Sequence, residues 1–128
     1  MLFIADCLNT YFDRRIHMKD QIWNFNNDIS SETTGTGVCR KILAYTDSLM
    51  CVENHFEAGS VGAPHSHPHT QILYVVSGVF EFDVAGEKKI IRSGDSVLVK
   101  GDLVHGCACQ ETGILLDIFT PMREDFVK

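Results

Sequence analysis

From residue 38 onward, short runs of apolar residues alternate with turns, most of which contain glycine. The runs that predict strands cover residues 38–45, 50–56, 72–76, 80–84, 89–92, 96–99, 103–108 and 114–119. No long segment has the periodicity of an amphipathic helix. Short strands separated by glycine-containing turns are typical of an antiparallel sandwich or barrel. The pattern therefore predicts an all-β fold, and 128 residues are enough for one domain.

The first 30 residues lack this strand pattern. Residues 1–17 have only a loose helical pattern, and residues 24–37 are rich in Asn, Ser, Thr and Gly, which is typical of a loop. We therefore divide the chain into an N-terminal extension and loop (1–30) and a barrel (31–128). Residues 1–17 are either an upstream extension, with Met18 as an alternative start, or an arm that packs on a neighbour.

One predicted strand differs from the others because both of its faces are apolar. Residues 80–84 alternate apolar with acidic side chains, so that strand has one wet face, whereas residues 72–76 are apolar throughout. An apolar outer face in so small a barrel needs a cover. We expect a second subunit, and hence a homodimer; the alternative is that residues 1–30 of the same chain cover this face.

Charge and composition narrow the choice of partners. Eleven Lys and Arg against 17 Asp and Glu give a net charge of −6, with the basic residues scattered, which argues against nucleic-acid and anionic-membrane partners. No apolar stretch is long enough to span a membrane, and the apolar N-terminus is interrupted by Asp6, so we expect no signal peptide. Five cysteines without paired spacing predict reduced thiols in a cytoplasmic protein.

The most informative segment is the histidine-rich run of residues 59–71. On an extended chain, alternate residues share a face, so His65, His67 and Gln71 can point into one cavity, where His105 joins them from a distant strand. Imidazoles that converge from separate strands are typical of a divalent transition-metal site. Because Gln71 is neutral, the ion keeps its full charge and favours an anionic ligand. The alternative is a degenerate site that has lost a ligand.

Three residues near these ligands, His69, Cys107 and Cys109, are not expected to bind the metal. His69 shares their parity but follows Pro68, so we expect it beside the ligands or at the surface. Cys107 and Cys109 share the parity of His105, and we expect buried thiols that fill the core rather than bind the metal.

A second candidate constellation lies on the last predicted strand. Asp117 occurs in an apolar run, with Phe119 on the same face, and Pro121 then turns the chain so that Arg123 can reach back. A carboxylate in an apolar strand is costly unless it has a partner or a task. Asp117 as a base and Arg123 as a carboxylate clamp would suit an anionic substrate. A structural Asp117–Arg123 ion pair explains the pattern equally well.

The spacing of these residues resembles the two motifs of the cupin family. The first motif is matched by Gly59, His65, His67, Gln71 and Gly78, and the second by Gly94 and His105, although Lys100 and Asp102 replace the usual Pro and Gly. The resemblance covers about residues 38–120. It implies a single-domain cupin barrel, that is, a double-stranded β-helix or jelly roll.

A closer resemblance is to the KdgF-type pectin-degradation cupins. It extends to the runs RKILAY (40–45), HSHPHTQ (65–71) and DIFTPMREDF (117–126). The resemblance implies one divalent ion, Zn, Ni, Mn or Fe, held by His65, His67, Gln71 and His105. It also implies catalytic roles for Asp117, Phe119 and Arg123, and glutamine is the usual fourth ligand of that family.

The function implied by this resemblance is metal-dependent ring opening of 4,5-unsaturated monouronates, which pectin and alginate lyases release. The product is the open-chain 4-deoxy-5-keto-uronate, and the partner is a small anionic sugar acid. Two other functions stay open: a metal-dependent oxygenase on the same barrel, which would consume oxygen, and a non-catalytic sugar-acid-binding protein, which would bind without turnover.

Overall fold

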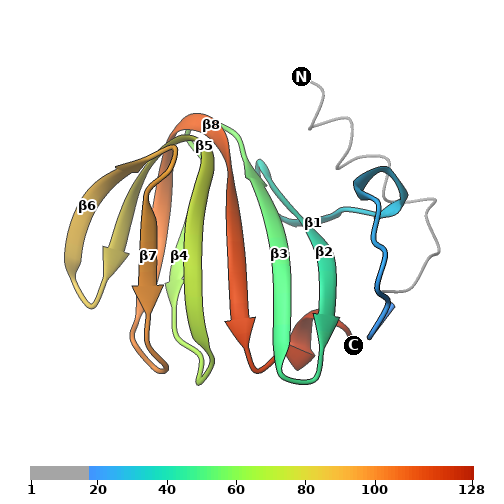
Figure 1. Ribbon diagram of the computed structural model, residues 1–128. Coiled ribbons are helices and arrows are strands. Elements are labelled where there is room, and N and C mark those ends of the chain that lie inside the picture. Colours follow the sequence, from blue (N-terminus) through green and yellow to red (C-terminus); the bar gives the residue numbers. More distant parts are fainter. Residues whose placement is uncertain (1–17) are drawn as a thin grey trace.

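A computed structural model describes residues 18–128; the predictions made for residues 1–17 lie outside this part (Figure 1). No helix in residues 18–128 is long and apolar enough to cross a membrane. The described helices are two short 3-10 turns, η2 (Asn26–Asp28) and η3 (Glu124–Phe126).

The rest of the regular structure is β-sheet, and all of its described pairings are antiparallel. The strands are β1 (Glu32–Gly35), β2 (Val38–Thr46), β3 (Leu49–Phe56), β4 (Val61–His65), β5 (Thr70–Val84), β6 (Glu87–Arg92), β7 (Ser96–Val99) and β8 (His105–Thr120). Their neighbours run in the order β1-β2-β3-β8-β5-β6, with β4 beside β8 and β7 beside β5. The predicted all-β fold is therefore confirmed.

Two long strands, β5 and β8, hold both halves of the barrel together. The first half of β5 pairs with the end of β8 and with β7, whereas its second half pairs with the start of β8 and with β6. The outer edge of β8 is covered in the same way, by β4 near its start and by β3 near its end. Figure 1 shows the resulting jelly roll, in which the two paired strands curve across the top of the molecule.

The bend in these strands depends on two glycines. Gly78 has a φ of +86°, and a Cβ at this position would lie 2.6 Å from the backbone oxygen of Glu111. A Cβ at Gly113 would overlap the backbone carbonyl of Ser77 on the facing strand. Glycine is required at both positions because the two backbones approach too closely for a side chain.

The structure corrects several predicted strand limits. Residues 72–76 and 80–84 form one bent strand, because Gly78 makes an irregularity in the ladder rather than a reversing turn. Residues 103–108 and 114–119 likewise belong to one strand that begins at His105. The predicted loop of residues 24–37 contains η2 and β1, and β4 was not predicted.

The strand over residues 72–76 is buried on one face only. Leu73 and Val75 lie in the core, whereas Ile72, Tyr74 and Val76 are each 44–47% exposed. Leu98 of the neighbouring β7 is also exposed. Residues 18–30 lie against β2, on the other side of the barrel (Figure 1). The described part of the 1–30 segment therefore does not cover this apolar face.

The core forms two clusters. The larger one fills the barrel between the two layers and includes Phe56, Leu73, Phe80 and Leu115. The smaller one comprises Ile42, Met50, Val52 and Phe119, and the C-terminal residues Met122, Phe126 and Val127 pack against it. This packing holds the segment after β8 against the end of the barrel.

Candidate metal centre and adjoining cavity

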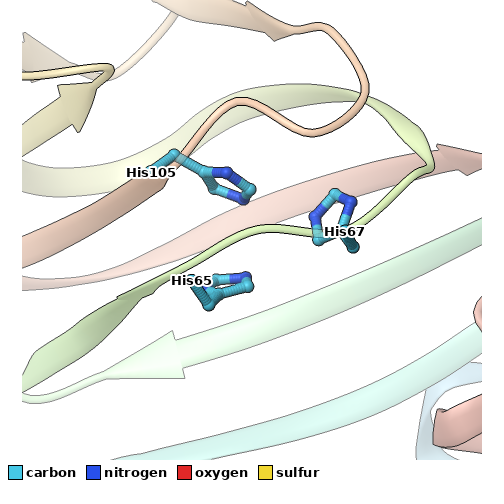
Figure 2. Close-up of side chains that lie close together, drawn as sticks. All are labelled: His65, His67 and His105. Atoms are coloured by element: carbon cyan, nitrogen blue, oxygen red, sulfur yellow. The ribbon is translucent and has the colours of Figure 1, made fainter.

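Three histidines converge at one end of the barrel. His65 is the last residue of β4, His67 follows it, and His105 begins β8 directly opposite His65 in the strand pairing. Each offers a ring nitrogen, and these atoms all lie within 4.8 Å of one another. Figure 2 shows the three rings turned toward a common space. These three side chains could hold a metal ion.

The backbone fixes the orientation of each ring. The Nδ1 atom lies 2.9 Å from the carbonyl oxygen of Ala63 for His65 and 2.9 Å from that of Leu103 for His105. A carbonyl oxygen can only accept, so Nδ1 carries the proton and Nε2 keeps its lone pair. The Nε2 atom of His105 is buried and has no hydrogen-bond partner. A buried, unpartnered lone pair beside two other imidazoles fits a metal ion.

The contacts of His67 give a second indication that these residues fit a cation. Its Nδ1 lies 3.1 Å from the carbonyl oxygen of His69, and its Nε2 lies 3.1 Å from Oε1 of Gln71. Burial, followed by the positive charge of Arg123, lowers the pKa of His67 to about 4, so the ring is neutral at pH 7. A neutral imidazole has one N–H and cannot donate to both oxygens. A cation at Nε2 would relieve the unmatched contact.

Gln71 is oriented by its other neighbour, Asp117. The amide Nε2 of Gln71 donates a hydrogen bond of 2.7 Å to Oδ1 of Asp117, which turns Oε1 toward His67. Both residues are buried, on the paired strands β5 and β8. A glutamate here would instead place two carboxylates in contact, and one of them would have to take up a proton. Glutamine therefore suits this site, which weakens the alternative of a degenerate fourth ligand.

Asp117 is held from its other side by a residue that sequence reasoning missed. The Nδ2 of Asn54 on β3 donates a hydrogen bond of 2.6 Å to Oδ2 of Asp117. Burial raises the pKa of Asp117 to about 6, although both amide donors and the charge of Arg123 oppose this shift. One signal could have identified Asn54: it lies between Val52 and Phe56, at an inward-facing position of an alternating strand.

The structural Asp117–Arg123 ion pair, which was the alternative to a catalytic role, does not form between these two residues. Arg123 instead binds Asp125, through Nε to Oδ1 at 3.1 Å and Nη2 to Oδ2 at 2.9 Å. Its guanidinium carbon lies 5.1 Å from the ring centre of Phe119. The opposite edge of the guanidinium makes no hydrogen bond to residues 18–128 and stays available to a carboxylate ligand.

Most of the groups described above, though not His67 or Asp125, line one cavity of about 270 Å³. Its walls include His65, His105, Gln71, Asp117, Phe119 and Arg123, together with Arg40, Asn54 and apolar residues of the core. The volume is slightly below the range of about 300–1,000 Å³ that is typical of pockets for drug-sized ligands, so the cavity suits a small ligand. A second cavity of similar volume lies between residues 18–30 and β2, and it is lined by none of these groups.

The sulfur atoms near the site are thiols. Burial raises the pKa of Cys107 to about 12 and also raises that of Cys109, so neither supplies a thiolate at neutral pH. Cys107 packs against the core and Cys109 lies in it, as predicted. Cys51, Cys107 and Cys109 are free. The expectation that all cysteines are reduced is wrong at Cys39, which is disulfide-bonded.

A double-stranded β-helix with three histidines facing one another at its end defines a class: a cupin barrel with a candidate metal centre. Residues 52–119 match the family described as Cupin domain. The pectin degradation protein KdgF of Dickeya dadantii (strain 3937) is 43% identical over 98 residues, which cover 75% of this chain and 89% of that protein. The chain therefore belongs to the cupin family and, within it, to the KdgF-type proteins.

Solved structures agree with this assignment. KdgF from a Halomonas species is 36% identical, with a TM-score of 0.79 over 82% of this chain and 99% of that one. An RmlC-like cupin from Shewanella frigidimarina NCIMB 400 is 38% identical, with a TM-score of 0.83 over 85% of this chain and 98% of that one. A salicylate 1,2-dioxygenase from Pseudoaminobacter salicylatoxidans, at 17% identity and a TM-score of 0.65, shares the fold alone.

Proposed function

We propose that this protein opens the ring of 4,5-unsaturated monouronates to give the 4-deoxy-5-keto-uronate. The similarity to the pectin degradation protein KdgF supports a sugar acid released from pectin as the substrate class. One observation carries the proposal: a buried carboxylate, Asp117, an arginine, Arg123, and two of the three clustered histidines line one cavity of about 270 Å³. An anionic ligand in this cavity can thus contact the positively charged Arg123 and the proton-transfer group Asp117 at the same time.

The candidate metal ligands are His65, His67, His105 and Oε1 of Gln71. A divalent ion bound there supplies Lewis-acid stabilisation for negative charge on an oxygen atom. The four donors are neutral, so they leave the charge of the ion uncompensated. Asp117 remains outside this set, because its oxygens accept hydrogen bonds from Gln71 and Asn54.

The reaction is an isomerisation and needs no co-reactant. A proton leaves the hydroxyl group on C1, the bond between C1 and the ring oxygen breaks, and C4 gains a proton as the enolate becomes a ketone. Asp117 carries these protons, since two amide donors hold its carboxylate in place and its pKa near 6 suits both acceptance and release at neutral pH. No nucleophile attacks carbon in this scheme.

Two further residues position the substrate. Arg123 binds the carboxylate of the sugar acid through the guanidinium edge that Asp125 leaves open. Phe119, which is 3% exposed, supplies an apolar wall beside His67, with the two ring centres 5.6 Å apart. The wall limits access of water to the reacting bond.

The test is turnover of lyase-generated unsaturated galacturonate by the metal-loaded protein. We expect loss of the absorbance of the conjugated alkene, with no uptake of oxygen at an electrode in the same cell. Unsaturated uronate from an alginate lyase, run in parallel, shows which polymer is the better source. Oxygen uptake coupled to substrate loss would instead indicate an oxygenase, and stoichiometric binding without turnover would indicate a binding protein.

A further inference from the structure

A second arginine lines the same cavity and has no role in the mechanism above. Arg40 lies on β2 between Val38 and Ile42, which are both buried, so it occupies an inward-facing position of an alternating strand. Its side chain is only 18% exposed. A charged side chain at such a position needs a specific partner or task.

The guanidinium of Arg40 is fixed on two sides. Its Nε and Nη2 lie 2.9 Å and 2.7 Å from Oε1 of Glu32, the residue that faces Arg40 in the β1–β2 pairing. Its central carbon lies 3.7 Å from the ring centre of Phe126 in η3. This distance is typical of an arginine that stacks on an aromatic face. Arg40 therefore ties the C-terminal segment to the sheet.

Phe126 also contacts the arginine assigned to the substrate. The guanidinium carbon of Arg123 lies 4.2 Å from the ring centre of Phe126, and the rings of Phe126 and Phe119 meet edge to face at 5.7 Å. The polar partner of Arg123 is Asp125, which belongs to the same short segment. The Arg123 guanidinium therefore lies beside both rings, and Phe126, besides packing on the smaller core cluster, also carries the Arg40 guanidinium.

We propose that Arg40 is a positioning residue: by stacking on Phe126, it holds the Arg123 guanidinium where that group receives the carboxylate of the substrate. The inference rests on the proposed function, since it explains what holds Arg123, the residue proposed to bind the carboxylate of the substrate. Arg40 acts through Phe126 rather than by touching the substrate, because Glu32 and the ring already occupy one edge and one face of its guanidinium.

The test is a double-mutant cycle on turnover of unsaturated galacturonate. We expect Arg40→Gln and Phe126→Leu each to raise KM roughly tenfold while kcat stays within about twofold. If Arg40 acts through Phe126, the double variant is no worse than the poorer single variant. Arg92→Gln, at an exposed arginine on β6, is the matched control and leaves KM unchanged. A multiplicative effect of roughly a hundredfold in the double variant would overturn the proposal.

A second readout does not depend on the reaction. In the zinc-loaded protein labelled with nitrogen-15, the Nε–H signal of Arg123 is assigned by its loss in Arg123→Lys. We expect Arg40→Gln and Phe126→Leu to shift or broaden this signal, and Arg92→Gln to leave it in place. An unchanged signal in both variants would overturn the proposal, even if the wild-type protein turns the sugar over.

The two readouts separate the possible failures. If the wild-type protein does not open unsaturated uronates, the proposed function fails, and the Arg123 signal alone decides the role of Arg40. Should Arg40→Gln lose its cooperative melting transition, Arg40→Lys takes its place in the same cycle, because it keeps the charge and the apolar stem but not the planar stack.

Discussion

Replacing Asp117 by asparagine separates a proton-transfer role from a structural one. The change keeps the shape of the side chain but removes its ability to take up a proton. General acid–base groups typically contribute about 10²–10⁴ in rate, so we expect turnover to fall by that factor. The variant should retain its metal, because the predicted ligands are unchanged.

The effect on the stability of the metal-free protein can be worked out from the contacts of Asp117. Asparagine has one acceptor oxygen for two donors, Asn54 and Gln71, so one buried N–H group is left without an acceptor, at a cost of about 2 kcal/mol. The pKa of Asp117, raised from 3.8 to about 6, means that the ionised, buried carboxylate destabilises the wild-type fold above pH 6. A difference of about two pKa units corresponds to a destabilisation of roughly 3 kcal/mol, and this destabilisation is absent from the variant because asparagine does not ionise. The two terms nearly cancel at pH 8.

The assay combines three measurements at pH 8. Loss of alkene absorbance gives turnover and elemental analysis gives the metal content. Thermal unfolding of the metal-free protein gives the melting temperature, which we expect to change by only a few degrees. Asp95→Asn is the matched control, since Asp95 lies in an exposed turn and accepts a backbone hydrogen bond from Arg92. A variant that melts early but turns over normally would refute the catalytic role of Asp117.

Three further predictions concern the metal, the assembly and the bend. The double variant His65→Ala/His105→Ala should lose its metal by elemental analysis, and full occupancy would contradict the site. Ile72, Tyr74 and Val76 leave an apolar face of β5 exposed, so light scattering should report a homodimer at micromolar concentration. Tyr74→Glu should give monomers, and a monomeric wild-type protein would contradict the prediction. Gly113→Ala should destabilise the fold by about 1–3 kcal/mol in urea unfolding, because its Cβ would overlap the carbonyl of Ser77; an unchanged midpoint would refute the required close approach.

Local pattern was enough to predict most of the sheet. The strands over residues 38–46 and 49–56 could be read from apolar runs bounded by a polar turn. The bend at Gly78 could not be predicted from the sequence. A glycine that allows a strand to bend looks the same in sequence as a glycine in a reversing turn. Only the facing backbone of β8 distinguishes the two cases.

Part of the candidate site could likewise be predicted from the sequence and part could not. The convergence of His65, His67 and His105 was predicted; His65 and His105 face each other on paired strands, and His67 joins them from the segment after β4. The partners of the charged groups were not, because they depend on which strands become neighbours. Asn54 reaches Asp117 from β3, and Arg123 pairs with Asp125 rather than with Asp117. Both results come from the packing of β3 and of the C-terminal segment, and spacing along the chain carries no record of either.

The continuous run of β8 restricts which changes in chain length the protein can tolerate. His105 and Asp117 lie on this strand with an even spacing, so both face inward despite their distance along the chain. Inserting a single residue between them would turn every later inward side chain outward, including the carboxylate. Removing or adding two residues would keep both side chains inward but would change the distance between His105 and Asp117 along the strand. Length variation among relatives should therefore fall in the turns at its two ends and spare its interior.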